Sequence, residues 1–156
     1  MNLLSLSTAG DWIYNSPSRG HGEIVDGKLI LFGAPLSYGA FRFDTPLTCG
    51  WVRLNAACQT EGLSSPETAV TVMISFYASD GNPLRRQYVA AAQGEAPGAL
   101  SFSRVLEVPE GAAGCTVELA LRWPRGGRAV FNQPVLMESE PPPDRSAHCC
   151  HELSSP

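Results

Sequence analysis

The sequence has no apolar run long enough to cross a membrane. Its longest apolar stretches, such as Lys28–Phe32, fall far short of the roughly 20 residues that a membrane-spanning helix needs. The sequence also has no excess of positive charge, because eleven Lys and Arg residues stand against fifteen Asp and Glu and give a formal net charge of −4. A chain of this charge has no overall attraction for nucleic acid or for an anionic membrane, so we expect neither as a partner.

A secretion signal and a disulfide framework are also missing. The first basic residue is Arg19, so the N-terminus lacks the positively charged start of a signal peptide, and no apolar segment with a cleavage site follows. The expected location is the cytoplasm if this chain start is native. Five cysteines form an odd set at irregular positions, which fits a reducing compartment or a piece of a longer secreted chain equally well.

Convincing helical periodicity is absent as well. Fifteen glycines and thirteen prolines are too many turn formers for a helical bundle and favour short strands joined by turns. A chain of 156 residues is long enough for one packed core but hardly for two. We therefore expect a single domain that is not all-α.

The periodicity that is present has a period of two. Between Ala69 and Tyr77, Val, Ile and Phe alternate with smaller or polar residues, which is typical of a strand with one buried face. Asp80–Pro83 has turn composition, and Leu84–Ala92 is predicted to be the returning arm of a hairpin. The same criteria predict further strands at residues 23–25, 28–32, 37–43, 50–57, 100–108, 115–123 and 128–137.

Eight or nine strands without a helix predict an all-β fold, a two-sheet antiparallel β-sandwich of the jelly-roll type. After Met137 the composition becomes polar and Pro-rich and loses its periodicity. We therefore predict a β-sandwich module over residues 1–137 and a flexible tail or linker over residues 138–156.

The order of the strand and turn segments is similar to that of a known group. The segments are Trp51–Ala56, Val70–Gly81, Val108–Ala112, Val117–Leu121 and Ala129–Leu136. Their order resembles that of galactose-binding-like jelly rolls, and among these the carbohydrate-binding modules attached to bacterial polysaccharide-degrading enzymes. The resemblance covers roughly residues 2–137 and rests on strand spacing and turn placement. It implies the fold and, as an expectation, a carbohydrate ligand.

The resemblance also implies a metal site only weakly. Members of that group often bind a structural calcium ion through acidic residues of the last strand, where this chain has Asn132 and Gln133. Neutral amide oxygens lack the charge that calcium favours, so no metal is expected. His148–His151 contains four zinc-type donors, but its two cysteines are adjacent and cannot easily share one tetrahedral ion. An exposed tail prone to oxidation is the expected role of that motif.

The residues offer little for catalysis. His21 is the one histidine of the module, with Glu23 two residues away, and no Ser or Cys lies in a nucleophile-elbow context. Asp26, Asp80 and Glu110 occupy turns, so the paired carboxylates of a glycosidase are not evident. The chain is therefore predicted not to be an enzyme, and a pocket that joined Glu118 or His21 to a second titratable group would reverse this prediction.

Strand alternation predicts a ligand-binding face. If the apolar positions point inward, aromatic and hydrogen-bonding residues point outward together. Aromatic rings stack on the C–H faces of sugars, while polar side chains bond to hydroxyl groups. Packing of Trp51 and Tyr77 at the edge of the core is the alternative, and Trp123 at a hairpin tip is either a ligand platform or a packed residue. The predicted ligand-binding residues are Trp51, Arg53, Asn55, Tyr77, Glu118, Arg122, Tyr38 and Trp123, with Thr71 and Arg42 beside them.

Two functional hypotheses follow. The first is a non-catalytic carbohydrate-binding or accessory module of a larger carbohydrate-active protein. The second is a β-sandwich for protein interaction or oligomerisation that packs against a catalytic domain, which the Pro-rich segment after Met137 favours because it resembles the start of a linker. The expected partner is accordingly a glycan or a neighbouring protein domain.

Overall fold

A computed structural model of the chain describes residues 1–4, 11–14, 21–33, 38–122 and 126–143, without the side chains of residues 11–14 and 21. Strands dominate the described residues, and one four-residue helix, α1 (Pro66–Ala69), lies among them. The all-β prediction is confirmed. The strands are β1 (Asp11–Tyr14), β2 (His21–Val25), β3 (Lys28–Phe32), β4 (Tyr38–Pro46), β5 (Trp51–Glu61), β6 (Val70–Ala78), β7 (Pro83–Val89), β8 (Ala91–Gln93), β9 (Ala99–Glu107), β10 (Ala112–Arg122), β11 (Arg128–Phe131) and β12 (Val135–Glu138).

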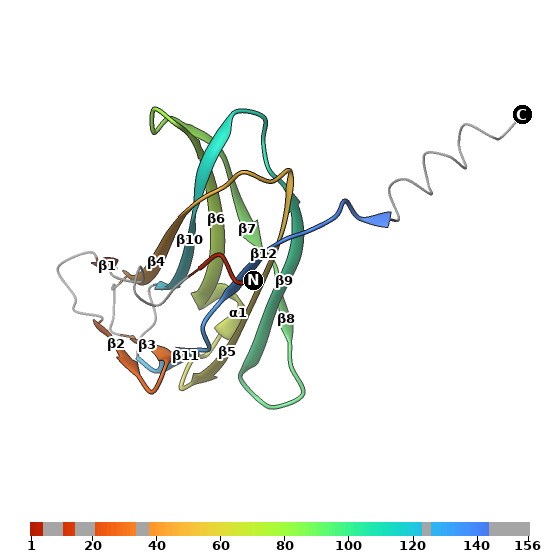
Figure 1. The fold of residues 1–156 in the computed structure, drawn as a ribbon. Helices are drawn as coiled ribbons and strands as arrows, with labels where there is room; N and C mark the ends of the chain where they lie inside the picture. Colours follow the sequence, from red (N-terminus) through yellow and green to blue (C-terminus); the bar gives the residue numbers. More distant parts are fainter. Residues whose placement is uncertain (5–10, 15–20, 34–37, 123–125, 144–156) are drawn as a thin grey trace, which may run out of the picture.

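The strands form two sheets that face each other (Figure 1). The five-stranded sheet has the order β1-β4-β10-β6-β7, and the seven-stranded sheet has the order β2-β3-β11-β5-β9-β8 with β12 also paired to β5. Every pairing of neighbouring strands is antiparallel. The prediction of a two-sheet antiparallel β-sandwich is therefore confirmed.

The described residues form twelve strands, whereas eight or nine were expected. The segment 84–92, predicted as one arm, is interrupted at Ala90, and its halves β7 and β8 join different sheets. The segment 128–137 is interrupted before β12 at Pro134, which has no N–H to donate to a ladder. Both β11 and β12 still pair with β5, at Cys58–Glu61 and Val52–Asn55, so they continue one another along the same partner.

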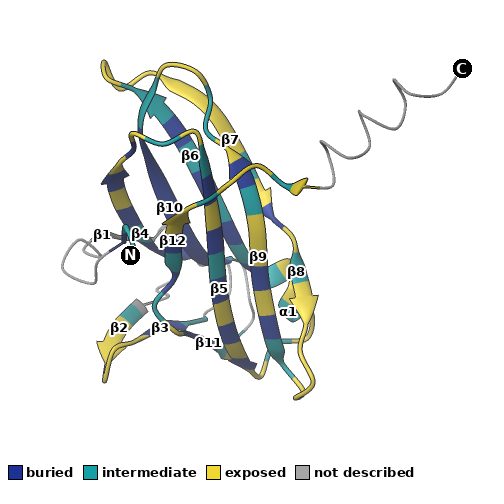
Figure 2. Ribbon diagram, turned by 45° about the vertical axis from the view of Figure 1, so that its right-hand side comes forward, coloured by how far each residue is buried: buried dark blue, intermediate teal, exposed yellow. Residues whose placement is uncertain are grey.

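Alternation of buried and exposed residues follows the expected period in β5, and in β9 except at the exposed Arg104 (Figure 2). In β6, Val70, Val72, Ile74 and Phe76 are buried while the residues between them are half-buried. Strand β10 differs, because every residue from Gly114 to Leu121 is buried. This strand is at the centre of the five-stranded sheet, and its residues are buried on both sides of the strand.

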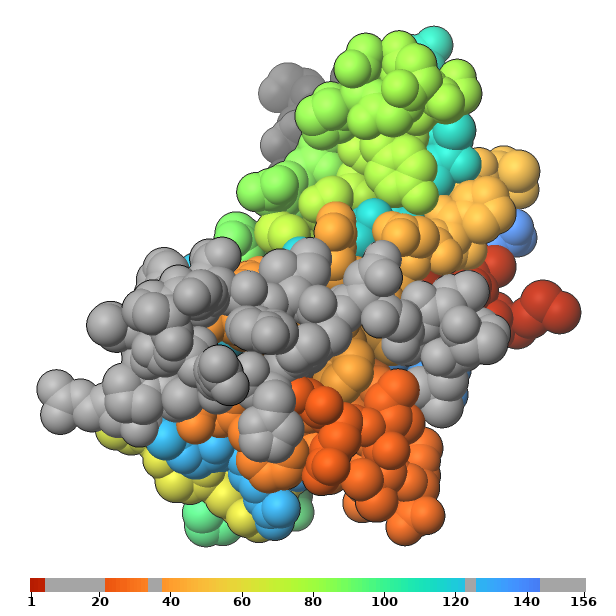
Figure 3. All heavy atoms as spheres, turned by 90° about the vertical axis from the view of Figure 1, so that its left-hand side faces the viewer, coloured from red at the N-terminus to blue at the C-terminus, as the bar shows by residue number. Residues whose placement is uncertain are grey.

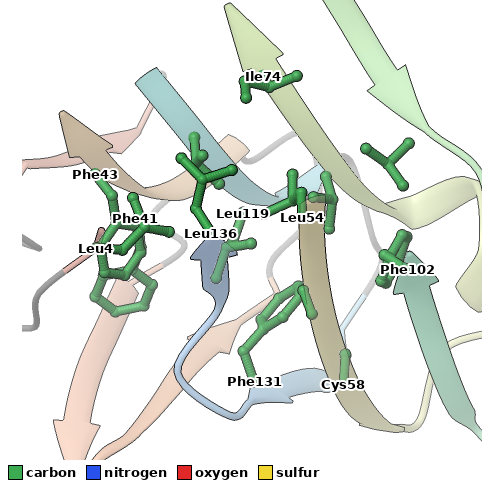
Figure 4. Close-up of a cluster of buried hydrophobic side chains, with 14 of the residues drawn as sticks. Leu4, Phe41, Phe43, Leu54, Cys58, Ile74, Phe102, Leu119, Phe131 and Leu136 are labelled. Atoms are coloured by element: carbon green, nitrogen blue, oxygen red, sulfur yellow. The ribbon is translucent and has the colours of Figure 1, made fainter. Parts of the chain in front are cut away.

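The core lies between the two sheets. Its largest fully buried side chains come from strands of both sheets, as the close-up shows (Figure 4). Burying a side chain of this size contributes about 1.5–3 kcal/mol to folding. The fully buried core side chains include Phe43, Ile74, Phe76 and Leu119 from the five-stranded sheet and Leu54, Phe102, Phe131 and Leu136 from the other.

The N-terminal residues are tied to the last strand. The Asn2 side chain donates to the Pro134 carbonyl and accepts from the Leu136 N–H at 2.9 Å, and the Leu3 N–H donates to the Leu136 carbonyl at 2.8 Å. At the other end of β12, the Ser139 N–H donates to the Trp51 carbonyl. Residues 144–156 lie outside the described part, so the tail at residues 138–156 stays a prediction.

Candidate functional site

The predicted ligand-binding residues lie on two opposite outer faces. Trp51, Arg53 and Asn55 belong to β5 of the seven-stranded sheet, whereas the other described candidates belong to β4, β6 and β10 of the five-stranded sheet. The expectation of one shared face is therefore wrong, because alternation gives the side of a strand but not the sheet to which it belongs. Trp123 and His148–His151 lie outside the described residues.

The outer side of the five-stranded sheet, here called the Glu118 face, carries most of the candidates. Strand register aligns four outward residues in one row, with Glu118 between Arg42 and Met73, and Tyr88 beyond Met73. Neighbouring strands lie about 4.8 Å apart, so this row spans about 14 Å. The face consists of Tyr38, Arg42, Asp44, Thr71, Met73, Ser75, Tyr77, Arg86, Tyr88, Thr116, Glu118 and Arg122.

Glu118 has a polar environment although its side chain is only 11% exposed. The Tyr38 hydroxyl donates to Glu118 Oε1, and Arg42 Nε lies 3.9 Å from Oε2. Burial raises the pKa of Glu118 above its ordinary value, since the charged form loses hydration there. The buried Arg42 Nε makes no hydrogen bond with the residues that the structure describes. The cluster therefore combines a carboxylate, a phenol and a guanidinium group that retains a donor.

Tyr77 rests on the sheet beside this cluster. A Cβ atom built at Gly114 would lie 2.9 Å from Tyr77 Oη and 3.0 Å from Cε2, so the ring lies directly over the glycine. Its hydroxyl donates to the Cys115 carbonyl at 3.4 Å. Burial, followed by the charge of Asp44, raises the Tyr77 pKa and keeps the phenol protonated. Tyr77 is thus a fixed aromatic plane that is still half-exposed.

Tyr88 and Arg86 were not predicted as site residues. Both lie on β7 and point to the same side as Met73 and Ser75, their cross-strand partners. Tyr88 is 54% exposed, and residues of β6 and β7 form the upper part of the surface in Figure 3. Alternation within the segment 84–92 could have indicated both residues, but its register was not fixed by the sequence.

Arg122 is occupied by a structural contact. Its Nε donates to the Thr68 carbonyl of α1 at 3.5 Å. On the opposite outer face, Asn55 Oδ1 accepts a hydrogen bond from Ser103 Oγ at 2.5 Å, and Arg53 is exposed beside it. Trp51, two residues before Arg53 on the same side of β5, lines a cleft with residues of β7 and β9.

Groups for covalent or metal chemistry do not converge in the described residues. Burial raises the pKa of the free Cys58 and Cys115 thiols to about 12, which keeps them protonated and unreactive. Gln133 donates its amide to the Leu4 carbonyl, and no three His, Cys, Asp or Glu side chains gather within the described part of the chain. The acidic ligands of a calcium site are therefore not assembled there. No described helix is long and apolar enough to span a membrane.

No protein-family model matches the sequence, and no curated protein matches it significantly. Solved structures do match. The enzymatically active domain of tailspike protein 4 from bacteriophage CBA120 has a TM-score of 0.63 at 14% identity over 86% of this chain, which spans only 21% of that one. A CBM4 structure has a TM-score of 0.57 at 11% identity, with 82% of this chain and 86% of that chain covered.

A family 16 carbohydrate-binding module has a TM-score of 0.53 at 12% identity, with 70% of this chain and 77% of that chain covered. The chain has the β-sandwich fold of carbohydrate-binding modules. The resemblance expected from strand spacing is thereby confirmed as a resemblance of fold. At these identities the carbohydrate-binding modules share their architecture with this chain, and the ligand has to be argued from its own residues.

Proposed function

We propose that the chain is a non-catalytic carbohydrate-binding module that binds glycans on the Glu118 face. The observation that carries this proposal is the combination of Tyr77 and Tyr88 with the row formed by Arg42, Glu118 and Met73. Aromatic rings provide platforms for the apolar faces of sugars, and a carboxylate and a guanidinium group fix the hydroxyl groups. The fold shared with carbohydrate-binding modules supports the proposal.

The two tyrosines are spaced for an extended ligand. Tyr77 and Met73 are four residues apart on β6, and Tyr88 is the cross-strand partner of Met73. At about 3.3 Å per residue, the backbone positions of the two tyrosines are roughly 13 Å apart along the strand direction. A glycan of a few sugar units reaches from one ring to the other, so we expect oligosaccharides to bind more tightly than monosaccharides.

The absence of a catalytic role is part of the proposal. Glu118 meets two titratable groups, Tyr38 and Arg42, but neither is a carboxyl group, and the Asp44 carboxylate on the same face accepts a hydrogen bond from the Thr116 hydroxyl. Hydrolysis of a glycosidic bond uses two carboxyl groups across the bond. We therefore propose an accessory role in a larger carbohydrate-active protein, with the galactose-binding-like jelly roll as the structural family.

Isothermal titration against a panel of neutral oligosaccharides tests this function. Tyr88→Ala removes a largely exposed ring, so the fold should persist while affinity falls about tenfold, corresponding to about 1.4 kcal/mol. Arg53→Ala on the opposite face is the control and should leave affinity unchanged. Absence of heat with every glycan, or equal losses in both variants, would refute binding on the Glu118 face.

A second candidate function is interaction with a protein, and edge strand β2 favours it. Ile24 and Val25 on this strand are 45% and 44% exposed, and no strand pairs with its outer edge within the described residues. Apolar side chains on an open edge are a typical docking surface. Sedimentation over a concentration series tests this candidate, since a monomer that binds glycans but no protein domain would argue against it.

A further inference from the structure

A second polar surface lies where both sheets end. Strand β7 is the last strand of the five-stranded sheet, and it lies beside β9 of the other sheet. Strand β8 pairs only with the Leu100–Phe102 half of β9, so the Ser103–Glu107 half is left without a strand on that side in the described part. A cleft of about 370 Å³ opens here, lined by Trp51, Arg85, Gln87, Arg104, Glu107 and Pro142 among others. We call it the edge cleft.

Two arginines of the edge cleft break the alternation of their strands. Arg85 is the cross-strand partner of the buried Phe76, and Arg104 is the partner of the buried Leu54. Both arginines therefore occupy inward positions at which apolar residues would be expected, and yet both are exposed. Polar residues at inward edge positions either protect the edge or serve a ligand.

The charged side chains of the edge cleft favour a negatively charged ligand. Two arginines and one glutamate line it, in a chain whose overall charge is −4. Arg128 is paired with Glu61 at 2.8 Å and Arg42 lies near Glu118, whereas the described structure contains no ion pair for Arg85 or Arg104. Arg85 Nη1 donates only to the Glu107 backbone carbonyl, at 3.5 Å. The cleft therefore presents guanidinium donors that no carboxylate of the described chain neutralises.

We propose that the edge cleft binds an acidic sugar through its negatively charged group. Arginine binds carboxylates and sulfates with two parallel hydrogen bonds, and the half-exposed Trp51 supplies the aromatic surface for the sugar ring. Glu107 repels the anion, so it restricts where the charged group lies. The inference rests on the proposed carbohydrate function but assigns a separate site and a ligand class.

Titration of the full chain with three oligosaccharides tests the edge cleft. The probes are trigalacturonate, which carries carboxylates, a heparin-derived hexasaccharide, which carries sulfates, and a neutral hexasaccharide. Arg104→Gln should weaken acidic binding about tenfold, because a charge-assisted hydrogen bond is lost. Arg53→Gln, which removes an equal charge from β5 outside the cleft, should change it less than twofold. Trp51→Ala should weaken acidic binding while leaving neutral binding intact.

The outcomes separate the two proposals. A preference for trigalacturonate or for heparin supports the edge cleft and shows which anionic group it takes. Binding of the neutral probe without any preference for an acidic one overturns the edge cleft and leaves the proposed function standing. Equal losses of affinity in the Arg104 and Arg53 variants also overturn the edge cleft, because the arginines would then act through general charge. Aggregation of the Arg104 variant without loss of affinity overturns it too, because Arg104 would then protect the sheet edge. Absence of binding with all three probes overturns the edge cleft, and the proposed function is refuted as well only if the whole neutral panel also fails to bind.

Discussion

The ionisation of one side chain on the Glu118 face, that of Glu118, affects the stability of the fold. Burial raises its pKa above 4.5, so the folded state holds this proton more tightly than the unfolded state. The resulting stabilisation is fully present below pH 4.5 and is lost as the pH rises through the raised pKa. Ionisation of Glu118 therefore lowers the stability of the folded state, which is typical of residues that serve binding.

The isosteric variant Glu118→Gln tests this coupling. Since an amide does not ionise, the free energy of unfolding of the variant should gain on that of the wild type as the pH rises from 4 to 7. Urea denaturation at several pH values measures both. A constant difference across that pH range would show that Glu118 has the same pKa in the folded and unfolded states.

Gly114 tests the position of Tyr77. An alanine there would place its Cβ 2.9 Å from both the Tyr77 hydroxyl and the Thr45 carbonyl, so the ring or the strand must move. We expect Gly114→Ala to destabilise the fold by about 1–3 kcal/mol and to weaken glycan binding. Gly50→Ala is the matched control, because nothing lies within 4 Å of its added Cβ. Equal unfolding free energies for the two variants would contradict this placement of the tyrosine.

For a single strand, the sequence predicts which side chains face the core better than it predicts which strands pair with it. Alternation in β6 correctly separated Val72 and Ile74 from Met73, because one face of that strand is buried and the other is only partly covered. It could not show that β10 is buried on both sides, nor that β5 belongs to the other sheet. Those facts depend on pairings between residues far apart in the chain, which is also why the candidate residues divided between two faces.

Strand β12 tests side-chain alternation directly after the interruption at Pro134. Leu136 is fully buried, whereas its neighbour Met137 is 40% exposed. We expect Leu136→Ala to lower the free energy of unfolding by about 2–5 kcal/mol, and Met137→Ala by about 0.5 kcal/mol or less. Denaturant titration of both variants provides the comparison. Similar values would mean that β12 is not packed in this register.

At the scale of the whole molecule, the sandwich keeps its surfaces apart. The Glu118 face lies outside the five-stranded sheet, the edge cleft is lined by residues of β7 and β9, and the exposed apolar residues of β2 lie on an edge of the seven-stranded sheet. Each surface can therefore be altered without disturbing the others. The fold itself was predictable from turn composition and periodicity, whereas Arg85 and Arg104 were not recognisable as site residues because they interrupt that periodicity.

Amide chemical shifts recorded during titration with a neutral oligosaccharide show whether glycans bind on the Glu118 face. Binding on the Glu118 face should move the signals of Met73, Tyr77 and Tyr88 in β6 and β7, together with Glu118 in β10. Signals of Arg53 and Asn55 on the opposite face should stay in place. An unchanged spectrum at saturating glycan, or changes confined to the opposite face, would exclude glycan binding on the Glu118 face.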